Sequence, residues 1–180
     1  MRIIRGKYKT RRFKVPKGFP SRPTTDFAKE GLFNILENKI DLENLKILDL
    51  CFGTGNISVE FLSREAGTVT AVDSNFNCVR HLKKVCNDLD CANEITILKS
   101  DMLKFLEKTS EKYDLIFTDP PFANKDHDKI VETVFDRDLL NEDGLLIIEH
   151  GKETNLENIT HFQFSRKYGN VVFSFFQIEE

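Results

Sequence analysis

The segment "LKILDLCFGTGNISVEFLSREA", residues 45–66, changes its pattern in the middle. Residues 45–52 form a short apolar run typical of a buried strand, whereas residues 56–66 repeat apolar side chains at helical spacing. Between them, Gly53 and Gly55 allow a sharp turn that brings backbone N–H groups close to a ligand. A buried strand, a glycine turn and a helix together form the first half of a βαβ unit. The segment therefore predicts a sheet of parallel strands.

The rest of the chain repeats this alternation of strands and helices. Further strands are expected at residues 68–74, 94–100, 113–119 and 144–150, with helices at 24–38, 77–90, 102–109 and 127–140. Residues 161–167 and 171–178 read as two strands joined by a tight turn at "YGN", which only antiparallel neighbours can share. We predict an α/β, Rossmann-like fold: a seven-stranded, mostly parallel, doubly wound sheet that ends in an antiparallel hairpin.

Bulk composition excludes several classes of protein. A chain of 180 residues with 40% hydrophobic and 31% charged residues is typical of one soluble domain. No apolar run approaches the roughly 20 residues of a membrane span, and no signal segment is evident, so we expect a cytoplasmic protein. The four cysteines form no C-x-x-C pair, and no metal site is expected. We also expect a monomer.

Positive charge is concentrated at the N-terminus. Nine of the 26 basic residues precede the first acidic residue, Asp26, and the remainder carries 17 basic against 29 acidic residues, a net charge of −12. A basic arm on an acidic body is the pattern expected for contact with a phosphate backbone. We therefore divide the chain into a basic arm, residues 1–22, expected to form a β-hairpin that contacts RNA, and a catalytic domain, residues 23–180. Within the arm, the candidate RNA contacts are Arg5, Lys7, Arg11 and Arg12.

Acidic residues lie in or at the end of the first three strands, and open parallel sheets bind their ligands beyond the carboxyl ends of their strands. Asp73 closes the second strand twenty positions after Gly53, where a carboxylate can bind the hydroxyl groups of a ribose. Asp101 ends the third strand and can accept from an adenine amino group, while Met102 can pack against the ring. Asp49 lies in the first strand and can reach toward a bound ammonium or order the glycine turn. With Gly53, Thr54 and Gly55, these residues predict a site for a cofactor that contains adenosine.

The identity of this cofactor follows from charge. A dinucleotide fingerprint requires a third glycine at position 58, where this chain has Ser58. A pyrophosphate also favours N–H donors over carboxylates, whereas the sulfonium and ammonium groups of S-adenosylmethionine tolerate nearby acids. The sequence therefore favours S-adenosylmethionine over a nicotinamide dinucleotide.

The segment "TDPPF", residues 118–122, follows the fourth strand and forms the candidate catalytic corner. Proline has no N–H group, so carbonyl groups here can face a ligand without competing donors. Asp119 and the Pro120 carbonyl could accept both N–H bonds of an exocyclic amino group, whose lone pair would then face a methyl donor. Phe122 offers a face on which a base can stack, and Pro121 lies beside it. A base within RNA or DNA would first have to unstack to reach this pocket.

Several segments resemble a known family, in order and spacing, over nearly the whole chain. "MRIIRGKYKTRRF", "RPTTDFAKEGLFNIL", "LDLCFGTGNISVEFLSREA", "VDSN", "DPPF" and "RKYG" are similar to the RsmD family of small-subunit ribosomal RNA guanine-N2 methyltransferases. The N-terminal segments are more specific than the glycine turn or D-P-P-F, which many amino methyltransferases share.

The resemblance implies a class I methyltransferase fold, S-adenosylmethionine as donor, and a guanine N2 in ribosomal RNA as acceptor, within the small subunit or an assembly intermediate. By position, Asp119, Pro120 and Phe122 match the catalytic corner of the family. Arg22, Thr24, Thr25 and Glu30 match its "RPTxxxxxE" segment, which borders the active site. The chain departs from the common pattern at Cys51, Phe52 and Thr54, and has Asp73 where Glu is frequent.

Two alternative functions remain open at this point. Amino methyltransferases that act on DNA adenine or cytosine, or on a protein glutamine, use a similar corner, although 180 residues leave no room for a separate DNA-recognition domain. A non-catalytic RNA-binding assembly factor is the alternative from another class, against which the intact Asp119, Asp73 and Gly53 speak.

Overall fold

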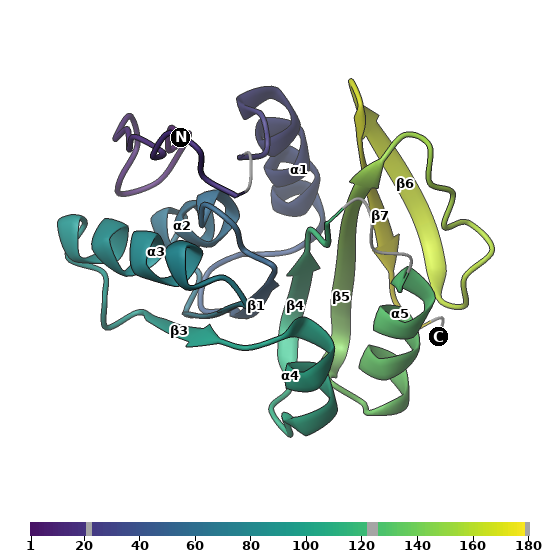
Figure 1. The fold of residues 1–180 in the computed structure, drawn as a ribbon. Coiled ribbons are helices and arrows are strands. Elements are labelled where there is room, and N and C mark those ends of the chain that lie inside the picture. The colour runs from purple at the N-terminus through teal and green to yellow at the C-terminus, as the bar shows by residue number, and fades with distance from the viewer. Residues whose placement is uncertain (21–22, 122–125, 179–180) are drawn as a thin grey trace.

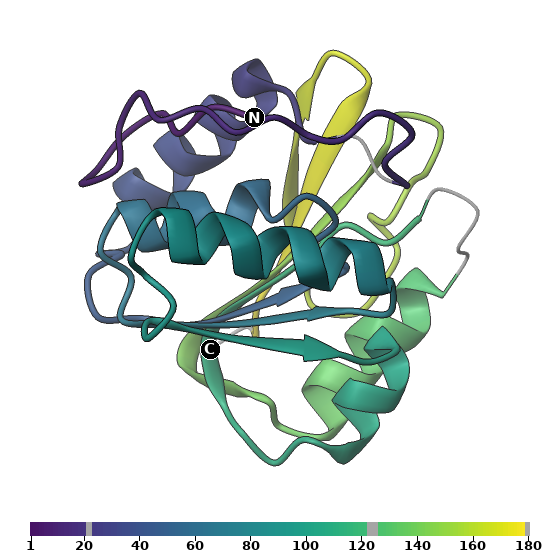
Figure 2. The same cartoon turned by 60° about the vertical axis from the view of Figure 1, so that its left-hand side comes forward.

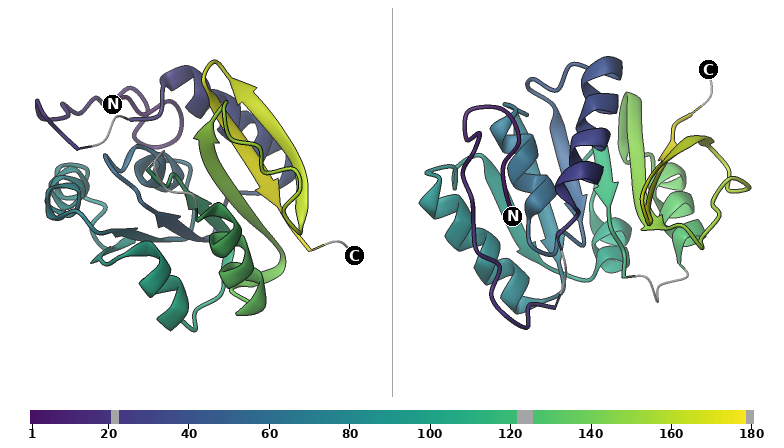
Figure 3. Two further views of the ribbon diagram at one scale, coloured as in Figure 1. Left: turned by 45° about the vertical axis from the view of Figure 1, so that its right-hand side comes forward. Right: turned by 90° about the horizontal axis from the view of Figure 1, so that it is seen from above.

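The computed structural model describes residues 1–20, 23–121 and 126–178, and in them the strands form a seven-stranded sheet of order β3-β2-β1-β4-β5-β7-β6. Neighbours among the first five strands pair in parallel, and β7 pairs antiparallel with both β5 and β6, as the sequence predicts. The strands are β1 (Lys46–Leu50), β2 (Thr68–Asp73), β3 (Ile95–Lys99), β4 (Tyr113–Thr118), β5 (Leu140–Gly151), β6 (Phe162–Tyr168) and β7 (Val171–Phe176). Figure 3 shows β3 at one edge of the sheet and the hairpin at the other.

Helices cover both faces of the sheet (Figures 1 and 2). One hydrophobic core lies between the sheet and the first three helices, and a second lies between the sheet and the last two. Strand residues alternate between these cores, so the parallel strands are buried on both faces. The helices are α1 (Asp26–Lys39), α2 (Asn56–Ser63), α3 (Phe76–Asp88), α4 (Met102–Lys108) and α5 (His127–Asp136).

The strand order reverses direction at β1. From β1 the chain runs outward to β2 and β3, then returns to the other side of β1 to form β4 and β5. Open α/β sheets bind ligands at such a reversal, beyond the carboxyl ends of the strands. A ligand site is therefore expected at the loops that follow β1 and β4.

The boundary between α5 and β5 differs from the sequence-based expectation. A helix is expected to reach residue 140, but α5 ends at Asp136 and β5 begins at Leu140. Asp138 has φ of 53°, which stops the helix, and Leu140 pairs with Tyr113 of β4. Periodic apolar residues at the end of a helix and at the start of a buried strand look alike, so strand pairing decided this boundary.

The N-terminal segment folds back on itself and packs against the helices of the first layer. An antiparallel bridge joins Arg2 to Arg12, and the Ile3 N–H donates to the Arg11 carbonyl at 3.0 Å. Ile3 is buried in the same core as residues of α1 and α2. The division at residue 22 therefore stays a prediction about function, since part of the arm is packed into the body.

A buried ion pair fixes this packing. Lys29 of α1 lies 3.0 Å from Glu60 of α2, with side chains that are 1% and 0% exposed. Glu60 also accepts from the Ile4 N–H at 2.9 Å and the Arg5 N–H at 3.1 Å, and Lys29 donates to the Arg2 carbonyl. Because buried charges are tolerated only when they are paired and hydrogen-bonded, these contacts hold the N-terminal segment against both helices.

None of the helices in the described residues is both long enough and apolar enough to cross a membrane. Residues 1–20, 23–121 and 126–178 also contain no cluster of His, Cys, Asp and Glu side chains that could hold a metal ion.

We expect Lys29→Met to lower the free energy of unfolding by about 3 to 5 kcal/mol, because it removes one of the two cations that pair with the buried Glu60 carboxylate and also the donor to the Arg2 carbonyl. Denaturant-induced unfolding followed by circular dichroism measures this change. Lys83→Met is the matched control on the exposed face of α3, and it should change stability by no more than about 0.5 kcal/mol. Equal effects of both variants would contradict the role of the ion pair.

Candidate active site

A cavity of about 620 Å³ lies at the carboxyl ends of β1, β2 and β4, where the strand order reverses. It has the volume of a small-molecule site. Eight of the residues that the sequence predicted for cofactor or substrate contacts line it: Thr24, Asp49, Gly53, Thr54, Asp73, Asp119, Pro120 and Pro121. The structure thus brings together residues from four separate segments of the chain.

The glycine turn after β1 depends on left-handed backbone conformations. Gly53 has φ of 55° and Gly55 has φ of 76°, backbone angles that residues other than glycine adopt only at a cost in conformational energy. A Cβ atom at Gly55 would also lie 2.4 Å from a methyl group of Leu82 in α3, so a side chain here would require Leu82 to move. Gly55 precedes α2 and allows the helix to begin directly below the cavity.

Asp73 orders the two loops that border the cavity. One of its oxygens accepts from the Gly53 N–H at 2.9 Å, and the other accepts from the Asn75 N–H at 2.8 Å. The carboxylate therefore ties the turn after β1 to the loop after β2. Each oxygen retains a second lone pair, so the predicted contact with ribose hydroxyl groups stays compatible with these bonds.

Asp49 is a buried carboxyl group in the floor of the cavity. It is 1% exposed, and one oxygen accepts from the Ser58 hydroxyl. The other oxygen, Oδ1, is buried and has no hydrogen-bond partner among the described residues. Burial, with smaller contributions from Asp119 and Asp73, raises the pKa of Asp49 to about 7. An orphaned buried acceptor of this kind fits a cationic group or an N–H donor of a ligand.

Asp119 follows β4 and lies next to the turn after β1. Its N–H donates to the Leu50 carbonyl at 3.3 Å, which fixes the start of the corner. Burial raises the pKa of the Asp119 carboxyl group to about 7. Pro120 and Pro121 continue the cavity wall from here. Phe122 lies outside the described residues, so its stacking role stays a prediction.

A further carboxyl group, which the sequence analysis did not single out, lies beside Asp119. Glu149 of β5 is 4% exposed and accepts from the Thr24 hydroxyl at 2.9 Å. Burial and the neighbouring Asp119 raise its pKa well above the usual range. In the sequence, "LLIIEH" reads as an ordinary buried strand. The signal that could have revealed this residue is an acid at the carboxyl end of a strand.

Besides Gly55, which precedes α2, two predicted cofactor residues lie outside the cavity lining. Asp101 caps the N-terminus of α4, where its side chain accepts from the Lys104 N–H at 3.0 Å. Met102 is buried in the second core, with its sulfur 3.3 Å from the Thr118 hydroxyl oxygen. The predicted contacts of both residues with adenine are therefore not visible in this geometry and stay predictions.

Predicted substrate residues outside the cavity have partners within the protein or lie on the surface. Thr25 caps α1 by accepting from the Ala28 N–H, and Glu30 lines a shallow hollow beside Tyr168. In the arm, the residues form surface contacts: Arg5 with Glu37, Lys7 with Glu94, and Arg11 with the Asp88 carbonyl. Arg12 is exposed. Arg22 lies outside the described residues.

Ten residues of the lining were missed by sequence reasoning. Most are apolar or uncharged and carry no recognisable chemical signal: Pro20, Pro23, Cys51, Phe52, Asn56, Ile57, Ser74, Asn75, Cys78 and Phe117. Asn56 has a clear structural role, since its amide donates to the Thr24 carbonyl at 2.9 Å and thereby joins α2 to the segment before α1.

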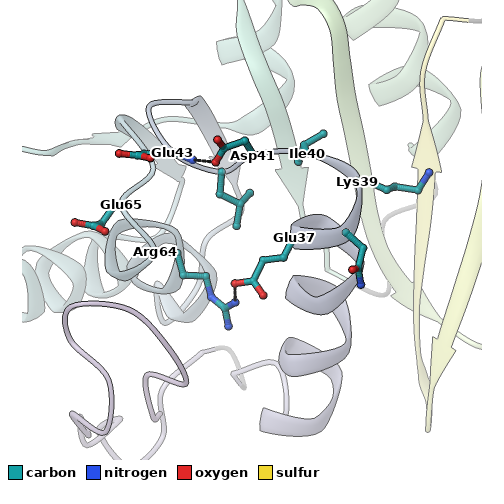
Figure 4. Close-up of a pocket in the computed structure, with 9 residues that line it drawn as sticks. Glu37, Lys39, Ile40, Asp41, Glu43, Arg64 and Glu65 are labelled. Carbon is teal, nitrogen blue, oxygen red and sulfur yellow. Dashed lines mark hydrogen bonds and ion pairs between the residues drawn. The ribbon is translucent and has the colours of Figure 1, made fainter.

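A second cavity, of about 550 Å³, lies near the amino end of β1 (Figure 4). It is bordered by the end of α1, the loop that precedes β1 and the end of α2, and its most prominent contact is the ion pair of Glu37 and Arg64. Because open parallel sheets bind ligands at the opposite edge, the cavity at the carboxyl ends is the better candidate for the active site.

The charge of the first cavity indicates the ligand that it fits. Three of its described lining residues are acids, Asp49, Asp73 and Asp119, and none of the described ones is Lys or Arg. This set is unsuited to a pyrophosphate and well suited to a ligand that carries positive charge. The apolar side chains of Phe52, Ile57 and Phe117 provide surface for flat rings.

Comparison with known proteins gives a consistent result. The family model described as "Conserved hypothetical protein 95" matches residues 1–177. "Putative rRNA methyltransferase YlbH" of Bacillus subtilis is 29% identical over 171 residues, which cover 93% of this chain and 92% of that protein. "Ribosomal RNA small subunit methyltransferase D" of Escherichia coli is 29% identical over 159 residues, which cover 88% of this chain and 79% of that protein.

A solved structure agrees with these relatives. "Putative methyltransferase yhhF from Escherichia coli" matches with a TM-score of 0.86 and 27% identity, over 99% of this chain and 98% of that one. The fold is that of class I S-adenosylmethionine-dependent methyltransferases. Because the family model covers nearly the whole chain, the protein belongs to the family "Conserved hypothetical protein 95", which is the RsmD family that the sequence analysis identified.

Proposed function

We propose that this protein transfers a methyl group from S-adenosylmethionine to the exocyclic N2 of a guanine in small-subunit ribosomal RNA. The observation that carries the proposal is the cavity at the strand reversal, which joins an acid-lined cofactor site to the D-P-P corner. The relatives named as ribosomal RNA methyltransferases support RNA as the substrate, and the small-subunit context follows from the names of several of them. We expect the protein to act in the cytoplasm as a monomer without a metal ion.

The residues of the cavity fit S-adenosylmethionine, which supplies an electrophilic methyl group on a positively charged sulfur. The buried Asp49 Oδ1 has no partner among the described residues, and an ammonium donor would satisfy it. Asp73, which accepts from two backbone N–H groups, would bind the ribose hydroxyl groups with its remaining lone pairs. The acids of this site thus compensate the positive charge of the donor.

The corner after β4 would orient the acceptor. An exocyclic amino group is a weak nucleophile because its lone pair is delocalised into the ring. Asp119 and the Pro120 carbonyl would accept its two N–H bonds, so that the lone pair points toward the methyl group. Holding the reactants in this orientation supplies a large part of the rate, and Asp119 can receive the proton that the amino group loses after transfer.

The proposal is tested by incubating the protein with labelled S-adenosylmethionine and, in parallel, with unmodified small ribosomal subunits, naked ribosomal RNA and DNA. We expect label in the ribosomal RNA, and digestion to nucleosides should identify N2-methylguanosine. Label that appears only in DNA or protein would overturn the substrate assignment, and absence of label in every sample would favour a non-catalytic binding protein.

We expect Asp119→Asn to lower kcat by about 100- to 1,000-fold, because the amide loses the charge and an acceptor that orient the amino group. Binding of S-adenosylmethionine, measured by calorimetry, should persist. Asp136→Asn, on the exposed end of α5, is the control and should keep full activity. A fully active Asp119→Asn variant would refute the catalytic assignment.

Cofactor binding should release protons near pH 7. The pKa values of Asp49 and Asp119 are raised to about 7 by burial, and a cationic ligand favours their ionised forms and lowers these values. The binding enthalpy at pH 7 should therefore depend on the ionisation enthalpy of the buffer, and this dependence should fade as the pH rises well above 7. S-Adenosylhomocysteine, which lacks the sulfonium charge, should release fewer protons. Equal enthalpies in phosphate and Tris buffers would contradict this expectation.

Basic side chains of the arm that are exposed, and form no ion pair within the described residues, should contact RNA. We expect the double variant Arg12→Ala, Lys14→Ala to reduce the slope of log affinity against log salt by about 2, one for each lost phosphate contact. Electrophoretic mobility or fluorescence anisotropy at several salt concentrations measures the slope. The control pair Lys108→Ala, Lys112→Ala lies in the α4–β4 region, away from the arm, and should leave it unchanged.

A further inference from the structure

Next to the cavity, although not among the residues that line it, lies a buried carboxyl group that the proposed chemistry has not yet used, Glu149. Thr118 of β4 pairs with Ile148 of β5, so Asp119 and Glu149 occupy neighbouring positions at the carboxyl ends of adjacent parallel strands. Their immediate predecessors on the same side of the sheet, Phe117 and Ile147, both belong to the first core. Asp119 and Glu149 therefore stand side by side on the face of the sheet that α1 and α2 cover.

A hydrogen bond from a residue that lines the cavity holds the side chain of Glu149. Thr24, which lines the cavity, donates its hydroxyl group to Glu149 at 2.9 Å. The Thr24 carbonyl accepts from Asn56 at 2.9 Å, and Asn56 accepts from Lys29 at 2.9 Å. A chain of hydrogen bonds thus runs from the buried Lys29 to Glu149.

Among the described residues, Glu149 has no cationic partner that would explain its burial as purely structural. Within residues 1–20, 23–121 and 126–178 it forms no ion pair, in contrast to the fully paired Glu60. A buried carboxyl group without a cation costs free energy, and proteins retain such groups mainly at functional sites. Its position beside Asp119, the proposed acceptor of the amino group, suits it to accept from a second donor on the same substrate.

The nucleobases differ in what lies beside their exocyclic amino group. In guanine, the N2 amino group is adjacent to N1–H, which is a donor. In adenine and cytosine, the ring nitrogen adjacent to the amino group carries a lone pair and is an acceptor. Two acceptors side by side therefore match guanine, whereas an acceptor beside a donor would match adenine or cytosine.

We infer that Glu149 accepts the N1–H of the target guanine while Asp119 accepts from its N2 amino group, which makes Glu149 the residue that selects guanine. This inference rests on the proposed function and adds the chemical basis of its specificity. The corner after β4 recognises an amino group, and the neighbouring strand recognises the ring position beside it. Thr24 acts as a positioning residue because it holds the Glu149 carboxyl group in this orientation.

The test compares guanine with 2-aminopurine at the methylated position of small-subunit RNA, within reconstituted particles. 2-Aminopurine keeps the amino group but has an unprotonated N1, so it lacks the donor that Glu149 would accept. The measured quantity is the ratio of transfer efficiencies, kcat/KM, for the two bases. Because 2-aminopurine also lacks O6, the informative result is the change in this ratio between the wild type and a variant.

We expect Glu149→Met to lower the preference for guanine by about 10- to 100-fold, mainly through slower transfer to guanine, because N1–H would then be buried without an acceptor. Glu149→Gln retains an uncharged acceptor oxygen, so its preference for guanine should lie between those of the wild type and Glu149→Met. This variant serves as the test if Glu149→Met does not fold. Asp136→Asn is the exposed control, which should keep the wild-type ratio.

The outcomes separate this inference from the function on which it rests. A wild-type protein that methylates no guanine in the RNA would refute the proposed function. A wild-type protein that methylates guanine, with variants at Glu149 that slow both bases equally or leave the ratio unchanged, would refute only the selection of guanine and would assign Glu149 to support of Thr24.

Discussion

Burial of negative charge at the carboxyl ends of the strands is the constraint around which this structure is organised. Asp49, Asp119 and Glu149 come from β1 and the ends of β4 and β5, and burial raises the pKa of each. Such a cluster is unfavourable unless it is protonated or meets a compensating ligand. The glycine turn after β1 and the proline corner after β4 leave open space beside these acids, so a cationic cofactor and the donors of a base can supply the compensation that the protein does not.

Beneath the N-terminal segment, by contrast, the buried charged side chains are paired with one another. Lys29, Glu60 and Arg64 satisfy one another and the backbone of the N-terminal segment, which attaches that segment to α1 and α2. Lys29 also donates to Asn56, and Asn56 in turn donates to the Thr24 carbonyl at the cavity wall. The N-terminal segment, proposed to contact RNA, and the proposed base pocket are thus joined by one network of buried hydrogen bonds.

Sequence patterns predicted the fold well because each strand and helix carries its own periodicity. They also located the glycine turn, Asp73 and the D-P-P corner, because a glycine turn or a proline pair at the end of a buried strand rarely serves packing alone. Sequence patterns did not distinguish Asp101, which caps a helix, from Asp49, which lines the cavity, because an acid at the end of a strand can cap a helix or bind a ligand. Glu149 escaped notice because it lies within an apolar run, and its neighbour Asp119 is thirty positions away in the sequence.

The sequence by itself determined the order of the secondary structure elements and the presence of an acid-rich site with a glycine turn, since these depend on local spacing and residue type. Only the tertiary structure decided which of the acids meet. Strand register places Glu149 beside Asp119, and packing of α1 against α2 places Thr24 and Asn56 above them. Register and packing depend on how distant segments share a core, and no local pattern encodes them.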